Sequence, residues 1–187
     1  MKRVLVLLAP GFEEIEAVTV IDILRRAGVE VVVAGTIAGP IAGCHRISLL
    51  PDTTLTVLEN DAFDMVVLPG GAEGTTNLRR DLRVANLIRR HVNQARYVAA
   101  ICAAPAVLAD MGLLTRRRVT SYPTYQSDLA GSVYSSERVV VDDRIVTSRS
   151  PGTALEFALT LIELLVSPEE RRRIGTQVLA AGASDVD

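Results

Sequence analysis

Residues 97–110 read YVAAICAAPAVLAD, an apolar strand pattern that turns directly into a helical one. We expect a strand over residues 97–101 and a helix that begins after Cys102. Pro105 suits the first turn of that helix, because proline has no amide hydrogen for the helix start to leave unpaired. A strand that leads into a helix is the repeating unit of α/β proteins, and the stretch therefore indicates that fold class.

The same unit recurs on both sides of this stretch. We expect strands at residues 4–8, 29–34 and 63–68, helices at 14–26 and 76–95, and a short strand at 119–121. A strand pair at 138–141 and 144–147 precedes a helix over 152–166 and a last helix that Ser167 caps. The segment 35–60, rich in glycine, proline and threonine, predicts a hairpin excursion. Strands that alternate with helices predict a mostly parallel sheet covered by helices on both faces.

The composition is that of a globular protein without a polyanionic partner. At 187 residues and 49% hydrophobic content, the chain is most simply a single domain, residues 1–187. The net charge of -2 argues against nucleic-acid binding. The apolar run at residues 4–9 is too short for a membrane span, and three glutamates follow it closely. We therefore expect a cytoplasmic protein without a membrane partner.

The two cysteines, Cys44 and Cys102, are too few for a disulfide framework and lack metal-ligand spacing. In a reducing compartment both are expected as free thiols. Cys44 lies in the irregular segment with no helix behind it, which favours a structural role. No metal and no cofactor are predicted.

Ligands of mostly parallel sheets bind at the carboxyl ends of the strands. Four segments follow predicted strands at that edge, namely 10–16, 69–74, 102–105 and 148–152. They hold most of the glycine, proline and polar residues outside the surface loops. The sequence therefore predicts the functional site where these segments converge.

Cys102 has the surroundings expected of a nucleophile on a strand-to-helix elbow. Such a turn is tight, so its neighbours must be small, and alanines flank Cys102 on both sides. The helix start behind the thiol favours thiolate and predicts a pKa below about 8.5. The amide of Ala103, with that of Gly70 or Gly71, can stabilise an oxyanion or a sulfinate. The alternative is a buried core cysteine, and the position at the sheet edge favours the nucleophile.

The partner of this thiol is harder to find. His91 is predicted to be exposed on a charged helix face, and His45 can reach a site only from an edge or from a partner subunit. A Cys–His pair for peptide hydrolysis is therefore poorly supported. Glu16 borders the apolar face of its helix, and a buried carboxyl beside a thiolate can stay protonated and donate a hydrogen bond.

The chain resembles the DJ-1/ThiJ/PfpI superfamily along almost its whole length. The motifs that carry the resemblance are VLVLLAPGFEEIEAV, IDILRRAG, CHRI, DMVVLPGGAEG, AAICAAPAVLA and VTSRSPGTALEFAL. The resemblance implies a flavodoxin-like sandwich and a homodimer. It also implies that Cys102 is the reactive, oxidation-prone cysteine, that Glu16 is its protonated partner, and that Gly71 and Ala103 supply amides near the sulfur.

By the same resemblance, Arg26 and Arg46 lie near the site across the dimer interface and favour anions there. Pro151, in the last of the motifs, is a further lining residue. Many members carry a histidine near the nucleophile, but here Ala103 follows Cys102 and Tyr122 stands where DJ-1 proper has histidine. This departure argues against the peptidase-like branch and is similar to YajL, so the chain is assigned to the DJ-1/YajL-like branch.

Three functions share the same thiol. The first is a cofactor-independent glyoxalase or protein deglycase, in which Cys102 attacks a small reactive carbonyl or a glycated protein and Glu16 moves the proton. The second is an oxidation-sensing redox protein or chaperone without turnover. The third, a cysteine peptidase or amidohydrolase, requires a nearby histidine. We expect the first, a stress-protection function.

Overall fold

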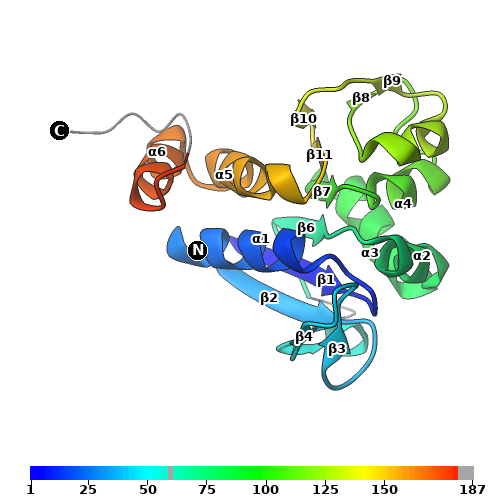
Figure 1. Ribbon diagram of the computed structural model, residues 1–187, viewed down its shortest axis with the longest axis horizontal. Helices are drawn as coiled ribbons and strands as arrows, with labels where there is room; N and C mark the ends of the chain where they lie inside the picture. Colours follow the sequence, from blue (N-terminus) through cyan, green and yellow to red (C-terminus); the bar gives the residue numbers. More distant parts are fainter. Residues whose placement is uncertain (59–60, 181–187) are drawn as a thin grey trace.

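The computed structural model describes residues 1–58 and 61–180 (Figure 1). Residues 59–60 and 181–187 lie outside this described part. The end of the predicted 35–60 segment and the end of the predicted domain 1–187 therefore also lie outside it. Among the described residues, seven strands form one sheet in the order β10-β11-β7-β6-β1-β2-β5. Neighbours in this sheet pair in parallel, apart from the antiparallel pair β10–β11. The predicted mostly parallel sheet is confirmed.

The strands of this sheet are β1 (Arg3–Leu8), β2 (Glu30–Gly35), β5 (Thr53–Thr54), β6 (Met65–Leu68), β7 (Tyr97–Ile101), β10 (Val139–Asp142) and β11 (Ile145–Ser148). Two small strand pairs stand apart from this sheet. The strands β3 (Ile41–Ala42) and β4 (Ser48–Leu49) pair antiparallel, and the strands β8 (Arg118–Val119) and β9 (Val133–Tyr134) pair in parallel. The β3–β4 pair is the hairpin predicted within residues 35–60.

The helices are α1 (Glu14–Arg26), α2 (Ala72–Arg80), α3 (Leu82–Asn93), α4 (Pro105–Asp110), α5 (Ala154–Leu165) and α6 (Pro168–Gln177). Short 3-10 turns occur at η1 (Leu55–Leu58), η2 (Pro123–Leu129) and η3 (Pro151–Thr153). Among the described residues, no helix combines the length and apolar character that a membrane crossing requires.

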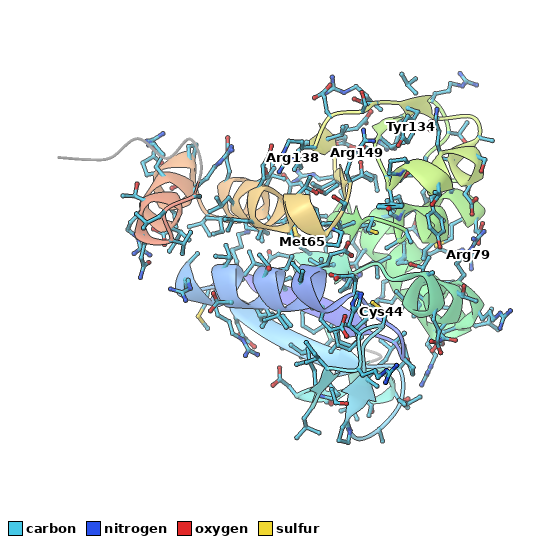
Figure 2. The ribbon with its side chains drawn as sticks, in the orientation of Figure 1. Cys44, Met65, Arg79, Tyr134, Arg138 and Arg149 are labelled. Atoms are coloured by element: carbon cyan, nitrogen blue, oxygen red, sulfur yellow. The ribbon has the colours of Figure 1, made fainter. Side chains whose placement is uncertain are left out.

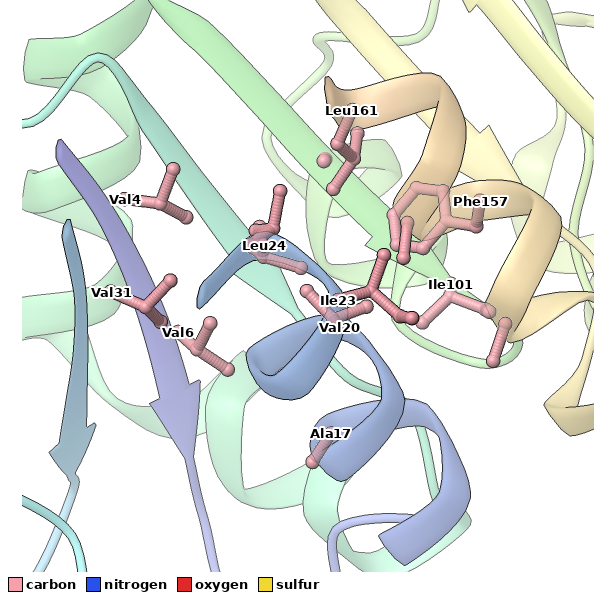
Figure 3. Close-up of a cluster of buried hydrophobic side chains, with 14 of the residues drawn as sticks. Val4, Val6, Ala17, Val20, Ile23, Leu24, Val31, Ile101, Phe157 and Leu161 are labelled. Carbon is pink, nitrogen blue, oxygen red and sulfur yellow. The ribbon is translucent and has the colours of Figure 1, made fainter. Parts of the chain in front are cut away.

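The alternation of side chains along the central strands divides the interior into two layers. Val6 and its alternate neighbours on β1 pack with Leu24 of α1 and Phe157 of α5, as Figure 3 shows. Leu7 points to the opposite face and joins a second cluster that includes Ile88 of α3. Because successive strand side chains point to opposite faces, a strand that is apolar throughout needs helices on both sides.

The helix predicted over residues 76–95 is wrong as a single element, because α2 and α3 meet at Asp81. The backbone of Asp81 is extended (φ -86, ψ 107), and its side chain accepts the Arg83 N–H at 2.9 Å. Aspartate is a strong N-cap, so it begins the second helix where the first one ends.

Helix α1 has the predicted bounds, but two of its apolar side chains point away from the core. The buried side chains include Glu16, Val20 and Leu24, whereas Ile15 and Val18 are 57% and 44% exposed. The apolar side chains of Ile15 and Val18 therefore lie outside the buried face of the helix. They leave an apolar stripe on the outer side of the helix.

Candidate active site

The four segments predicted to form the site follow β1, β6, β7 and β11, which are consecutive neighbours in the sheet. Since these strands run in parallel, their carboxyl ends meet at one edge. This edge holds the start of α1, the turn before α2 and the turn before α4, which are close together in Figure 1. The topology thereby brings Glu16, Gly70 and Cys102 together from segments far apart in the chain.

Cys102 forms the predicted elbow between β7 and α4. Its φ of +64° lies in the left-handed region, which side chains other than glycine rarely adopt. Its N–H donates to the Ser148 carbonyl at 2.9 Å, and its carbonyl accepts the Tyr122 N–H at 2.8 Å. Strained backbone of this kind persists only where its surroundings hold it, and it is concentrated at functional sites.

Glu16 lies beside this thiol with no exposure to solvent. Its Oε2 accepts the Gly70 N–H at 2.7 Å, while its Oε1 is buried with no hydrogen-bond partner among the described residues. Burial, with a smaller contribution from the charge of Glu13, raises the pKa of Glu16 to about 8. The carboxyl therefore holds a proton at neutral pH, as the sequence led us to expect.

The pKa of Cys102 departs from the sequence prediction. Burial raises the pKa of the thiol, the adjacent charge of Glu16 raises it further, and the amides of Gly71 and Ala103 lower it. The net direction is upward, opposite to the lowering predicted from the helix start. The contribution from the Glu16 charge exists only while that carboxyl is ionised, and protonation of Glu16 removes it.

Gly70 allows the turn before α2 to approach the elbow. A Cβ at this position would lie 2.7 Å from both the Cys102 Cβ and the Glu16 Oε2. The Gly70 amide donates a hydrogen bond to Glu16. Of the two glycines predicted to stabilise the sulfur, it is therefore Gly71 whose amide, together with that of Ala103, acts on Cys102. The φ of +90° at Gly71 aims that amide and favours glycine there.

The remaining predicted residues lie at different distances from this centre. Tyr122 touches the elbow through its backbone, and its side chain is 42% exposed. Pro151 begins η3, directly after β11. Arg26 pairs with Asp22 at 2.7 Å at the opposite end of α1 from Glu16, and Arg46 is exposed in the β3–β4 loop. Their predicted approach across a dimer interface stays a prediction.

One residue, Tyr125, was missed from the sequence, and another, His91, was misjudged. Tyr125 lies on η2 near the thiol, and burial and the Cys102 charge raise its pKa. The repeat of tyrosine in SYPTYQ was the available signal, since residues three apart share a side of a 3-10 turn. His91 is buried, not exposed, because it completes the apolar stripe of α3, and its Nδ1 lies 3.0 Å from the Leu87 carbonyl.

Comparison with known proteins places this chain in a family. The sequence profile of the DJ-1/PfpI family matches residues 2–164. Protein dj-1beta of Drosophila melanogaster is 42% identical over 183 residues, covering 96% of this chain and 98% of that protein. The glutathione-independent glyoxalase DJR-1.2 of Caenorhabditis elegans is 36% identical over 172 residues, covering 90% of this chain and 91% of that protein.

The solved structure of Toxoplasma gondii DJ-1, described as oxidized, matches with a TM-score of 0.94 at 38% identity. The match covers 97% of this chain and 100% of that one. The flavodoxin-like α/β sandwich is thus confirmed. With a profile match over most of its length and relatives of this identity over nearly all of it, the chain belongs to the DJ-1/PfpI family.

Proposed function

We propose that this protein is a cofactor-independent enzyme that removes small reactive carbonyls, of the glyoxalase or protein deglycase type. The observation that carries the proposal is the elbow itself, where Cys102 at φ +64° adjoins a buried Glu16 whose pKa is about 8. A carboxyl poised near neutral pH can both donate and accept a proton during one reaction cycle. The name of the C. elegans relative as a glutathione-independent glyoxalase supports the same class of reaction.

The chemistry follows from these groups. The Cys102 sulfur adds to the aldehyde carbon of an α-oxoaldehyde, a C–S bond forms, and the carbonyl oxygen takes up a proton. The amides of Gly71 and Ala103 lie near the sulfur, where they can stabilise the developing oxyanion. Glu16 moves a proton from the former aldehyde carbon to the neighbouring carbon, and the hydroxyl proton passes to the ketone oxygen, which leaves a 2-hydroxy thioester. Water then cleaves the thioester, releases the 2-hydroxy acid and restores the thiol.

Turnover of methylglyoxal tests this mechanism. We expect Cys102→Ala to abolish turnover and Glu16→Gln to reduce it by about 10²–10⁴-fold, the usual contribution of a positioned proton-transfer group. Cys44→Ala is the matched control and is expected to retain the wild-type rate. Equal residual rates in wild type, Cys102→Ala and Glu16→Gln would contradict the proposal.

An oxidation-sensing or chaperone function is the second candidate, supported by the relative whose structure is described as oxidized. Sulfinate formation at Cys102 would place its oxygens near the same amides and the Glu16 carboxyl. Mass spectrometry after mild peroxide treatment tests it. If Cys102 stays reduced while Cys44 oxidises, this candidate fails.

A peptidase or amidohydrolase function has less support. His45 pairs with Glu14, and His91 bonds to Leu87, so neither histidine's described contacts include the Cys102 thiol.

We further propose that the protein is a homodimer. The exposed apolar stripe of Ile15 and Val18 on α1 supports this assembly. The predicted cytoplasmic location and the assignment to the YajL-like branch stay predictions.

A further inference from the structure

A second cluster of reactive side chains lies where the start of α1 meets the β3–β4 loop. It consists of Glu13 and Glu14 from one segment and Cys44 and His45 from the other. Figure 2 shows Cys44 between the hairpin and the first turn of α1. The carboxylates are buried, at 6% and 4% exposed, whereas the thiol and the imidazole are accessible. The proposed reaction at Cys102 uses none of these four side chains.

The donor atoms of this cluster are spaced for a single small cation. His45 Nδ1 lies 2.9 Å from Glu14 Oε2 and 3.2 Å from Cys44 Sγ, and Cys44 Sγ lies 3.4 Å from Glu14 Oε2. Glu13 Oε1 is 4.0 Å from His45 Nδ1, and all four donors lie within 4.8 Å of one another. Ligands around a tetrahedral zinc ion are separated by roughly 3.3–3.8 Å, given its bond lengths of about 2.0–2.3 Å.

Each carboxylate is oriented by the backbone through one oxygen and offers the other to the cluster. Glu13 Oε2 accepts the Glu16 N–H at 2.8 Å, which leaves Oε1 towards His45. Glu14 Oε1 accepts the N–H groups of His45 and Ile47 at 2.6 and 3.3 Å, which leaves Oε2 towards Cys44. Outer contacts of this kind fix the direction of metal ligands.

The loop that holds Cys44 and His45 is itself anchored to α1. The Cys44 N–H donates to the Phe12 carbonyl at 2.8 Å. A Cβ on Gly43 would lie 2.4 Å from the Glu14 carboxyl, so only glycine permits this approach. The exposed thiol and imidazole are therefore held next to the buried carboxylates.

The charge of the cluster also favours a cation. Two carboxylates, those of Glu13 and Glu14, lie in it beside one imidazole and one thiol. A divalent ion would compensate their negative charge.

We propose that Glu13, Glu14, Cys44 and His45 bind one divalent transition-metal ion of the zinc class. Carboxylate, thiolate and imidazole together are a typical zinc donor set. On binding, the Cys44 sulfur exchanges its proton for a metal–sulfur bond, and that proton goes to solvent. His45 coordinates through Nδ1 in the tautomer that carries hydrogen on Nε2. No metal was predicted from the sequence, because the two segments are 30 residues apart.

The test uses Co²⁺ and Zn²⁺ with Cys102→Ala protein, in which Cys44 is the remaining thiol. We expect Co²⁺ to produce a thiolate-to-metal charge-transfer band and Zn²⁺ to displace it. Adding Cys44→Ser should abolish the band. Adding His45→Ala should lower Zn²⁺ affinity at least about 10-fold in competition with a chromogenic chelator, since loss of an outer-shell partner alone costs about 10–100-fold.

Asp22→Asn, in the same Cys102→Ala protein, is the matched control on α1 and should leave the Zn²⁺ affinity unchanged. Cys44 and His45 are exposed, and circular dichroism of each variant verifies its fold. Zn²⁺ should also protect Cys44 from alkylation and bind more tightly as pH rises, because the thiol must lose its proton. Absence of the charge-transfer band, or equal Zn²⁺ affinity with and without His45, would overturn the proposal.

Discussion

At the scale of single residues, the protonation of Glu16 determines the charge beside Cys102. Its carboxyl has no access to water, and its pKa is about 8 because burial disfavours the ionised form. The protonated form offers the thiol a donor, and the ionised form opposes the thiolate. The same group therefore affects both reactivity and stability.

The stability prediction concerns Glu16→Gln. Between about pH 4.5 and about pH 8 the folded protein keeps the Glu16 proton that the unfolded chain has lost. The contribution of Glu16 to stability is complete below pH 4.5 and falls by about 1.4 kcal/mol per pH unit up to pH 8. Denaturant unfolding across this range should show wild type losing free energy of unfolding relative to Glu16→Gln. Parallel curves for the two proteins would contradict a raised pKa.

At the scale of elements, the site depends on the close approach of two strand-to-helix turns. The turn after β6 reaches the turn after β7 at Gly70, where no Cβ fits between the Cys102 and Glu16 side chains. The amide of the same glycine orients Glu16. A glycine next to the site thus serves packing and chemistry together.

We therefore predict that Gly70→Ala displaces either the elbow or Glu16. The expected result is a loss of about 1–3 kcal/mol in the free energy of unfolding, as for other overpacked sites, together with reduced methylglyoxal turnover. Gly152→Ala is the matched control, because the nearest atom to its Cβ is 3.8 Å away. Chemical denaturation and turnover assays of both variants measure the effect. A Gly70→Ala protein that matches Gly152→Ala in both would show that the approach is not needed.

At the scale of the whole molecule, the outer face of α1 is left with apolar side chains exposed. Val18 lines a groove together with Val33 and Leu50, and Ile15 lies one turn earlier on the same helix. Burial of such a surface in a second copy of the chain would remove it from water.

Val18→Asp should accordingly weaken the proposed homodimer, because it would place a charge in an apolar contact. Val133→Asp, at a more exposed valine on β9, is the control and should leave assembly unchanged. Sedimentation velocity across a concentration series measures the effect. A wild-type protein that sediments as a monomer at all concentrations would contradict the homodimer.

Local patterns were enough to predict most of the order of strands and helices, the α/β class and the elbow at Cys102. Apolar periodicity, proline at a first helical turn and small residues around a tight turn are properties of neighbouring residues, so they can be read without the fold. The bounds of α1 and β7 agree with these predictions. Asp81 shows the limit, since a continuous helical pattern concealed an N-cap.

The tertiary structure alone decided which groups meet and how deeply they are buried. The pKa of Cys102 rises because the sheet edge buries it against Glu16, a fact that no local spacing contains. His91 is buried through packing of its helix, and the cluster of Glu14 and Cys44 exists because the β3–β4 loop folds back onto α1. Desolvation and ligand distances depend on contacts between distant segments. The sequence therefore predicted that Cys102 and Glu16 form a pair, and the fold determined their burial, their ionisation and the surroundings of the second thiol.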